Sequence, residues 1–121
     1  MIPKFRVWDK DLKKIRPADL IDLMKQISAY NISDLTINIV FMQSTGMSDI
    51  NGVDIFEGDI VKPVSFASWI GVVKYSPENA AYILDDNNNE FVKGENVYLS
   101  QFNDGLEVLG NIYENPELMG V

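Results

Sequence analysis

The stretch from Gly46 to Val64, GMSDINGVDIFEGDIVKPV, places four acidic side chains around two glycine turns. Asp49, Asn51 and Asp54 could supply oxygen ligands to a cation. A calcium loop of the helix-loop-helix type closes with a bidentate Glu at its twelfth position, and Ile60 stands there. We therefore predict no metal site in this stretch.

The same acids could instead do acid–base chemistry. Asp54, Glu57 and Asp59 are close enough in sequence to converge, and a raised carboxyl pKa would let one of them exchange protons. Acids around a tight exposed turn stay hydrated, however, and the chain has no His and no Cys. Imidazole bases, thiol nucleophiles, disulfides and the usual zinc ligands are thus excluded, and no phosphate-binding glycine loop or serine elbow is present. We expect no enzyme, no catalytic residue and no cofactor.

A structural role explains the polar residues of this stretch better. The Asn51-Gly52 pair suits a two-residue turn with positive φ, and in the second turn the Asp59 carboxylate can accept backbone N–H groups. We assign structural turn roles to Asn51, Gly52, Gly58 and Asp59. Pro63 has no N–H to donate, so its strand should lie at a sheet edge or be bulged there.

Short runs of branched and aromatic residues predict the elements that hold these turns. With 121 residues, 46% of them apolar, the chain fits a single domain with its own core. Glycine turns between short strands indicate a strongly bent antiparallel sheet, so the predicted fold is mainly β, an SH3-like β-barrel. Besides a strand near the N-terminus and the strand that DIVKPV enters, the predicted strands cover residues 35–42, 69–76, 80–85, 90–94 and 106–112.

The N-terminal region changes its period. KFRVW alternates basic and apolar residues, so a strand over 4–8 places Phe5 and Val7 on one face, and DKDLKK turns the chain back. In RPADLIDLMKQISAY the apolar residues recur at helical spacing, which predicts one short helix over 18–29, with Pro17 in its first turn. A strand broken at ADL is the competing interpretation. The single domain 1–121 then comprises an N-terminal hairpin, helix and strand (1–45), a small barrel core (46–112) and a tail (113–121).

The formal net charge of −8 is unevenly distributed. Residues 1–25 hold seven bases and four acids, whereas residues 76–121 hold one base and nine acids. The acidic part should repel a phosphate backbone, and the basic part could contact one only weakly, because affinity grows with the number of phosphates neutralised. Nucleic-acid binding is therefore disfavoured. The alternative that both charge sets are only solvated surface stays open.

The aromatic residues suggest where a partner could bind. The aromatic residues Trp8, Phe66, Trp69, Tyr75 and Tyr82 could line a groove that stacks on a peptide or on single-stranded bases, although most of them are expected to fill the core. Trp8 is the exception, since it would share a strand face with Lys4 and Arg6. The candidate interaction surface comprises Lys4, Arg6, Trp8, Lys13, Lys14 and Pro63. No apolar run reaches the roughly 20 residues that cross a bilayer, and no signal core is visible, so we expect a cytoplasmic protein without membrane contact.

Three blocks of the sequence resemble one family. MIPKFRVWDKDLKK at the start, FMQSTGMSDINGVDIFEGDIVK in the middle and LEVLGNIYENPELM at the end are similar to the YopX family of phage and prophage proteins, whereas residues 16–38 match less well. The resemblance implies a largely β, small-barrel protein that a bacteriophage or prophage encodes and that acts in the bacterial cytoplasm. It brings no assigned activity, cofactor or catalytic residue.

The first functional hypothesis is a non-enzymatic protein-binding or assembly module. Its partner would be a host or phage protein, contacted through an edge strand or the acidic C-terminal half. The opposite charges of the two ends would also let copies associate as a homo-oligomer. The alternative is a regulator of nucleic-acid transactions, acting by weak phosphate contact or by acidic DNA mimicry.

Overall fold

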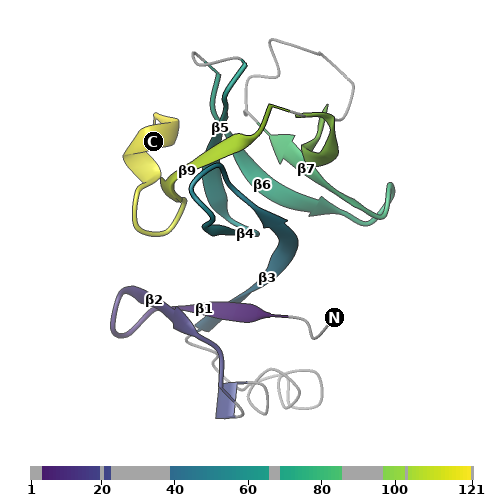
Figure 1. Ribbon diagram of the computed structural model, residues 1–121. Coiled ribbons are helices and arrows are strands. Elements are labelled where there is room, and N and C mark those ends of the chain that lie inside the picture. Colours follow the sequence, from purple (N-terminus) through teal and green to yellow (C-terminus); the bar gives the residue numbers. More distant parts are fainter. Residues whose placement is uncertain are drawn as a thin grey trace. The chain divides into compact units, whose positions relative to one another are not determined.

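Antiparallel strands form the larger part of the residues that the computed structural model describes, which are 4–19, 21–22, 39–65, 69–85, 97–102 and 104–120. Contacts divide the chain into two compact units, Met1–Gln43 and Ser44–Val121. Figure 1 shows the elements coloured along the sequence, from purple to yellow. The mainly β fold that the sequence predicts is thus confirmed.

The first unit is built on a three-stranded ladder. Its strands are β1 (Phe5–Asp9), β2 (Lys14–Pro17) and the start of β3 (Ile39–Ser48). β1 is the middle strand and pairs antiparallel with both neighbours, so that Val7 lies between Arg16 and Phe41. Val7 is fully buried, whereas Phe5 on the same strand face is partly exposed and packs edge-on against Phe41 at 6.1 Å. The alternation of KFRVW thus places Phe5 and Val7 on the same face of β1, and Val7 is the buried residue of the two.

An aspartate shapes the turn between β1 and β2. Asp9 Oδ1 accepts the backbone N–H groups of Asp11 and Leu12, each at 3.0 Å, and the Lys13 N–H donates to the Asp9 carbonyl at 2.7 Å. Lys13 has φ +53°, in the left-handed region that non-glycine residues seldom adopt. The Asp9 hydrogen bonds therefore hold a turn that contains no glycine.

A helix begins shortly after β2. Asp19 and Asp22 each accept the other's backbone N–H at 2.9 Å, a reciprocal pairing that caps a helix N-terminus, and Ile21 and Asp22 are helical. Of the helix predicted over 18–29, residues 18 and 19 precede the helix, and residues 20 and 23–29 lie outside the described residues. Pro17 ends β2 rather than opening the helix, because the helix starts only after its Asp19 cap.

The second unit contains a strongly curled five-stranded antiparallel sheet in the order β8-β7-β6-β5-β9 (Figure 1). The end of β3 forms a separate ladder with β4. The strands are β4 (Asp54–Phe56), β5 (Asp59–Pro63), β6 (Gly71–Ser76), β7 (Ala81–Asp85), β8 (Val97–Tyr98) and β9 (Leu106–Asn111). Two short 3-10 helices follow β8 and β9, namely η1 (Leu99–Gln101) and η2 (Pro116–Met119).

One hydrophobic cluster forms the core of this unit. Its buried members are Ile55, Val61, Trp69, Val73, Leu84, Leu99 and Leu106. They come from β4, from four strands of the sheet, from η1 and, in the case of Trp69, from the segment before β6, so burial of these side chains joins the ladder, the sheet and the helix. Gly71 permits the close approach of β6 and β7, since a Cβ there would lie 2.8 Å from Leu84 Cγ. A larger residue at this position would push Leu84 out of the core.

Most predicted strands have direct counterparts. Those over 69–76, 80–85 and 106–112 correspond to β6, β7 and β9. β3 runs past its predicted end at Met42 to Ser48, while the strand predicted over 90–94 lies outside the described residues. The strongly bent antiparallel sheet is confirmed, and a closed SH3-like barrel stays a prediction.

The expectation that Pro63 lies at a sheet edge or at a bulge is wrong, because the register shift between β5 and β9 falls between Ile60 and Val61. β5 is an interior strand between β6 and β9, and Pro63 is buried. The ladder with β6 ends at the Val61–Gly71 pair, so on that side Pro63 needs no N–H donor, and on the other side it pairs with Leu106. Pro63 therefore does not belong to an interaction surface.

Candidate functional site

The Asp49 carboxylate joins the turn after β3 to strand β9. Asp49 Oδ1 accepts the N–H groups of Asn51 at 2.8 Å and Val53 at 2.9 Å, and Oδ2 accepts the Val108 N–H at 3.0 Å. The Ile50 N–H also donates to the Leu106 carbonyl at 2.9 Å. The turn 49–53 therefore lies along the outer edge of β9 and makes contacts there that a neighbouring strand would otherwise make.

These bonds keep the buried Asp49 side chain ionised. Burial alone would raise the pKa of Asp49, but the N–H groups of Val108, Val53 and Asn51 hold the pKa below its ordinary value. A carboxylate with three backbone donors on its two oxygens has little capacity left for a cation, and its lowered pKa does not suit proton exchange near neutral pH. Asp49 is a structural residue in this geometry.

The second glycine turn is fixed in a similar way. Gly58 has φ +86°, its N–H donates to the Val73 carbonyl at 2.9 Å, and its carbonyl accepts the Ile112 N–H at 3.0 Å. Asp59 is buried, and its Oδ2 accepts the Phe56 N–H at 2.8 Å. The turn that opens β5 is thus bonded to β6 and to the residue after β9, as a structural turn requires.

The first turn glycine and the acids around it also take backbone roles. Gly52 has φ +82°, and its N–H donates to the Asp49 carbonyl at 3.0 Å next to Asn51. Among the described residues no three His, Cys, Asp or Glu side chains come together in a group that could hold a metal ion.

Three aliphatic side chains near β9 are about half exposed, and we call them the apolar rim: Ile50 (52%), Val53 (49%) and Val64 (46%). Ile50 packs on Gly105, where a Cβ would lie 2.7 Å from its Cγ2, and the Val64 N–H donates to the Gly105 carbonyl at 3.0 Å. Val53 is held beside Val108 through the Asp49 carboxylate that both bind. The rim is therefore gathered along Gly105–Val108 and has a well-fixed backbone.

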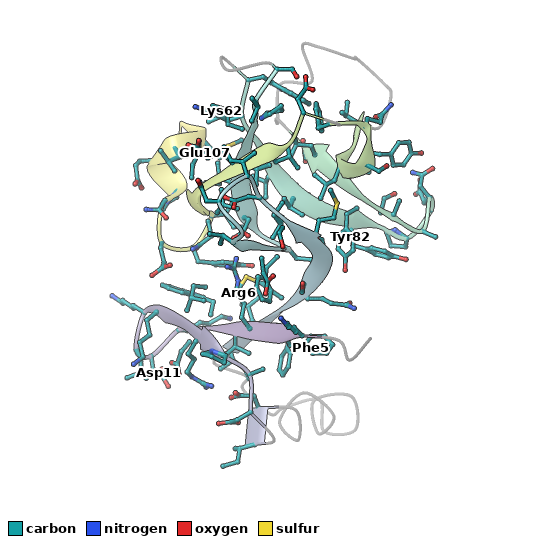
Figure 2. The ribbon with its side chains drawn as sticks, in the orientation of Figure 1. Phe5, Arg6, Asp11, Lys62, Tyr82 and Glu107 are labelled. Carbon is teal, nitrogen blue, oxygen red and sulfur yellow. The ribbon has the colours of Figure 1, made fainter. Side chains whose placement is uncertain are left out.

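Acidic residues surround the apolar rim. Asp54 follows Val53, and Asp104 and Glu107 flank Gly105–Leu106, while the Ser65 hydroxyl donates to the Asp104 carboxylate. Lys62 lies opposite Glu107 on β5 and β9, as Figure 2 shows. The rim thus combines apolar contact area with a local excess of negative charge.

The basic residues predicted as an interaction surface are separated by the fold. Lys4, Lys13 and Lys14 are exposed, whereas Arg6 and Trp8 are partly buried on β1. On the Arg6 face of the ladder, the opposite residue on β3, Met42, is buried. An open surface that includes Arg6 and Trp8, as the strand period suggested, is therefore not what the structure presents.

The turn between β1 and β2 collects the exposed cations instead. Lys10, Lys13 and Lys14 are exposed around Leu12, whose side chain is 60% exposed, and we call Lys10–Lys14 the hairpin tip. Asp11, labelled in Figure 2, is the single acid of this segment. The sequence reveals the lysines, but the exposed leucine between them becomes visible only in the folded turn.

The sequence did not lead us to expect a buried ion cluster next to the hairpin tip. Arg16 donates to both oxygens of Asp22, with NH1–Oδ2 at 2.5 Å and NH2–Oδ1 at 2.8 Å, and its Nε lies 3.4 Å from Asp9 Oδ2. The Arg16 hydrogen bonds hold the pKa of Asp22 well below its usual range, and Asp22 in turn raises the pKa of Arg16. The pKa of Asp9 is lowered chiefly by the Leu12 N–H, with help from Arg16. The sequence signal for this cluster is an Arg that stands six residues before an Asp at a helix start.

The aromatic candidates divide between core and surface. Trp69 packs in the core against Phe102 at 5.6 Å, while Phe66 lies outside the described residues. Tyr75 and Tyr82 form an edge-on pair at 5.3 Å across β6 and β7, and Tyr75 is the more exposed. Burial raises the pKa of Tyr82, and the charge of Glu57 and the neighbouring Tyr75 raise it further. In this pair the edge of one tyrosine ring meets the face of the other, so the two rings do not form a parallel stack onto which nucleic-acid bases could add.

The comparisons with known proteins place the chain in a family. Among the described residues, no helix has the length and apolar character needed to span a membrane. Among curated proteins none matches the sequence. The fold is similar to that in the crystal structure of protein EF1440 from Enterococcus faecalis, with a TM-score of 0.62 and 26% sequence identity, covering 98% of this chain and 99% of that one. The family described as YopX protein matches residues 4–120. The chain therefore belongs to the YopX protein family.

Proposed function

We propose that this chain is a non-enzymatic protein-binding module that a phage or prophage encodes, that it acts in the bacterial cytoplasm, and that the apolar rim is its contact surface. The observation that carries the proposal is the exposure of Ile50, Val53 and Val64 on backbone that hydrogen bonds hold in place. Exposed aliphatic side chains that gather in one place are typical of contact sites between proteins. The phage origin and the cytoplasmic location rest on the family resemblance.

The state of the acids favours binding over catalysis. Of the three carboxylates expected to be capable of acid–base chemistry, Asp54, Glu57 and Asp59, the last is buried and accepts a backbone N–H group, as the buried Asp49 also does. Their hydrogen bonds stabilise turns, so recruiting either one as a general base would cost the fold its support. The same turns carry the rim, so these acids would stabilise a contact surface and need not take part in catalysis.

The hydrogen bonds at β9 also define how a partner would bind. The Leu106 carbonyl and the Val108 N–H at the outer edge of β9 are already used by the turn 49–53. A partner strand could not take these positions without displacing the turn. Recognition should therefore proceed through the rim side chains and the charges around them.

A comparison of matched variants tests this proposal. The wild-type protein, the rim variant Ile50→Ser with Val53→Thr, and the control Leu118→Ser are immobilised and exposed to extract of a bacterial host. Leu118 is an exposed residue of η2 and not part of the rim. We expect the wild type and the control to retain the same host or phage protein and the rim variant to lose it. Equal recovery on all three surfaces would contradict the assignment of the rim.

A second candidate function is regulation of nucleic-acid transactions, favoured by the three exposed lysines of the hairpin tip. Direct phosphate contact predicts binding in a gel-shift series that weakens steeply as salt rises. Acidic mimicry of DNA predicts no gel shift but capture of a basic DNA-binding protein from the same extract. Recovery of neither DNA nor a basic protein would argue against both forms of this candidate.

A further inference from the structure

We infer that the hairpin tip of one copy binds the apolar rim of a second copy. Leu12 would contact the aliphatic side chains of the rim, and the lysines of the tip would face the carboxylates around it. This inference deepens the proposed function, because it rests on the rim as a protein-binding surface and names the partner. The two surfaces complement each other in apolar character and in charge.

The apolar parts match in exposure and in rigidity. Leu12 is 60% exposed on a turn held by three hydrogen bonds to Asp9, and the rim residues are about half exposed on the turn 49–53 and beside Gly105. Leu12 is among the most exposed large apolar side chains of the described residues. Since both surfaces are already ordered, their association would lose little conformational entropy.

The charges have opposite signs. Around the rim, the segments 49–54, 62–65 and 104–107 hold four acids and one base, a net charge of −3. The hairpin tip, residues 10–14, holds three lysines and Asp11, a net charge of +2. Asp9 and Arg16, which flank the tip, are bound to each other, so they change this balance little. Opposite potentials steer the two surfaces together and select their orientation.

A second copy is the partner that these observations favour. Every copy carries both surfaces, so each rim meets hairpin tips at the protein's own concentration. Because the tip and the rim are different patches, the contact forms either an isologous dimer, in which each copy gives its tip to the rim of the other, or a heterologous head-to-tail assembly. The rim alone would accept any basic apolar segment, but this chain itself supplies one of the right composition.

Charge reversal in pairs tests the contact. The tip variant is Lys10→Glu with Lys14→Glu, and the rim variant is Asp54→Lys with Asp104→Lys. Lys13 is left unchanged because of its left-handed backbone. Sedimentation velocity and light scattering over a dilution series, from about 0.05 to 1 M salt, measure association. We expect the wild type to associate at low salt and each variant alone to associate at least about tenfold more weakly.

Mixing the variants gives the decisive result. The tip variant keeps an acidic rim and the rim variant keeps a basic tip, so an equimolar mixture should associate through this restored pair of surfaces. The reversed tip of the first variant and the reversed rim of the second are also opposite in charge, which allows a 1:1 complex. A charge-matched control, Glu78→Lys with Glu117→Lys, changes two exposed acids outside the rim and should associate as the wild type does. Leu12→Ser should weaken association, whereas Leu118→Ser should not. Thermal unfolding of every variant verifies that each is folded.

The outcomes separate this inference from the proposed function. A wild type that is monomeric at every salt concentration, or a mixture that does not associate, overturns the contact between copies. If the rim nevertheless retains a host or phage protein in the extract experiment, the proposed binding function stands without self-association. If rim variants alter neither association nor capture, both proposals fail.

Discussion

The carboxylate of Asp49 lies beside β9, where the strand's edge would face its next neighbour, and accepts the Val108 N–H at 3.0 Å. The two residues are 59 positions apart in the chain. The same carboxylate holds the turn 49–53, so one side chain stabilises both the turn and the edge of the sheet. Loss of this side chain should therefore affect the free energy of unfolding far more than loss of an exposed acid.

Replacing Asp49 by Ala should lower the free energy of unfolding by about 2 to 4 kcal/mol, because three backbone N–H groups would lose a charged acceptor. Urea unfolding measures the change. Added calcium or magnesium should not alter the unfolding curve of the wild type or of the variant. A divalent-dependent rise in the melting temperature of the wild type that Asp49→Ala abolishes would overturn the structural role of this residue.

Stability should fall in acid through a defined window. Asp49 and Asp22 have folded-state pKa values below the ordinary value of 3.8, so their contribution is present above about pH 4 and is lost as pH falls from there through the folded-state pKa. Urea unfolding between pH 7 and pH 2 tests this. The stability difference between the wild type and Asp49→Asn should shrink over that window. A constant difference down to pH 2 would contradict the lowered pKa of Asp49.

Gly110→Ala should destabilise the C-terminal turn by about 1 to 3 kcal/mol, because a Cβ would overlap the Asn115 side chain, with Cγ at 2.7 Å. Asn115 is held there by its Oδ1, which accepts the Asn111 N–H at 3.2 Å. The same substitution in an Asn115→Ala background should cost less. Gly52→Ala, where open space surrounds the Cβ but φ is +82°, should cost about 1 kcal/mol in either background. Equal losses for Gly110→Ala in both backgrounds would exclude the overlap as the cause.

Arg16→Lys should lower the free energy of unfolding although it keeps the charge. The guanidinium donates to both oxygens of Asp22, whose side chain is 2% exposed, and an ammonium cannot reproduce this planar fork. A double-mutant cycle with Asp22→Asn should give a coupling energy of about 1 to 3 kcal/mol. Additive losses would show that the two residues act independently.

Local patterns predict the strands where one face is buried. β6 and β7 are rich in branched and aromatic residues, and glycine, proline and asparagine turns mark their ends, so their positions could be predicted closely. β3 is longer than predicted because Gly46, with φ +81°, does not end it. Glycine is usually a turn signal, but here it is tolerated within a strand whose pairing with β4 shifts register at the same place.

Long-range partners explain what the sequence could not predict. The role of Asp49 depends on Val108, 59 residues away, and the role of Arg16 depends on Asp22, which the chain's path from β2 into the helix brings close. Pro63 suggests an edge strand from its missing donor, yet its strand is interior, and the proline is tolerated because the β6 ladder stops two residues earlier. The residue types marked these positions as unusual. The register of the sheet determines which partners each residue contacts, and therefore its structural role.

The Asp49 contact with β9 has a consequence for solubility. An edge strand with open N–H and carbonyl groups is a template on which strands of other molecules can add and grow into aggregates. At Leu106 and Val108 these groups are taken by the chain's own turn, and a charged side chain is buried in the space that an invading strand would need. Asp49 therefore blocks intermolecular β-pairing at this edge. Its protonation in acid would weaken that block over the same pH range in which the folded state loses stability.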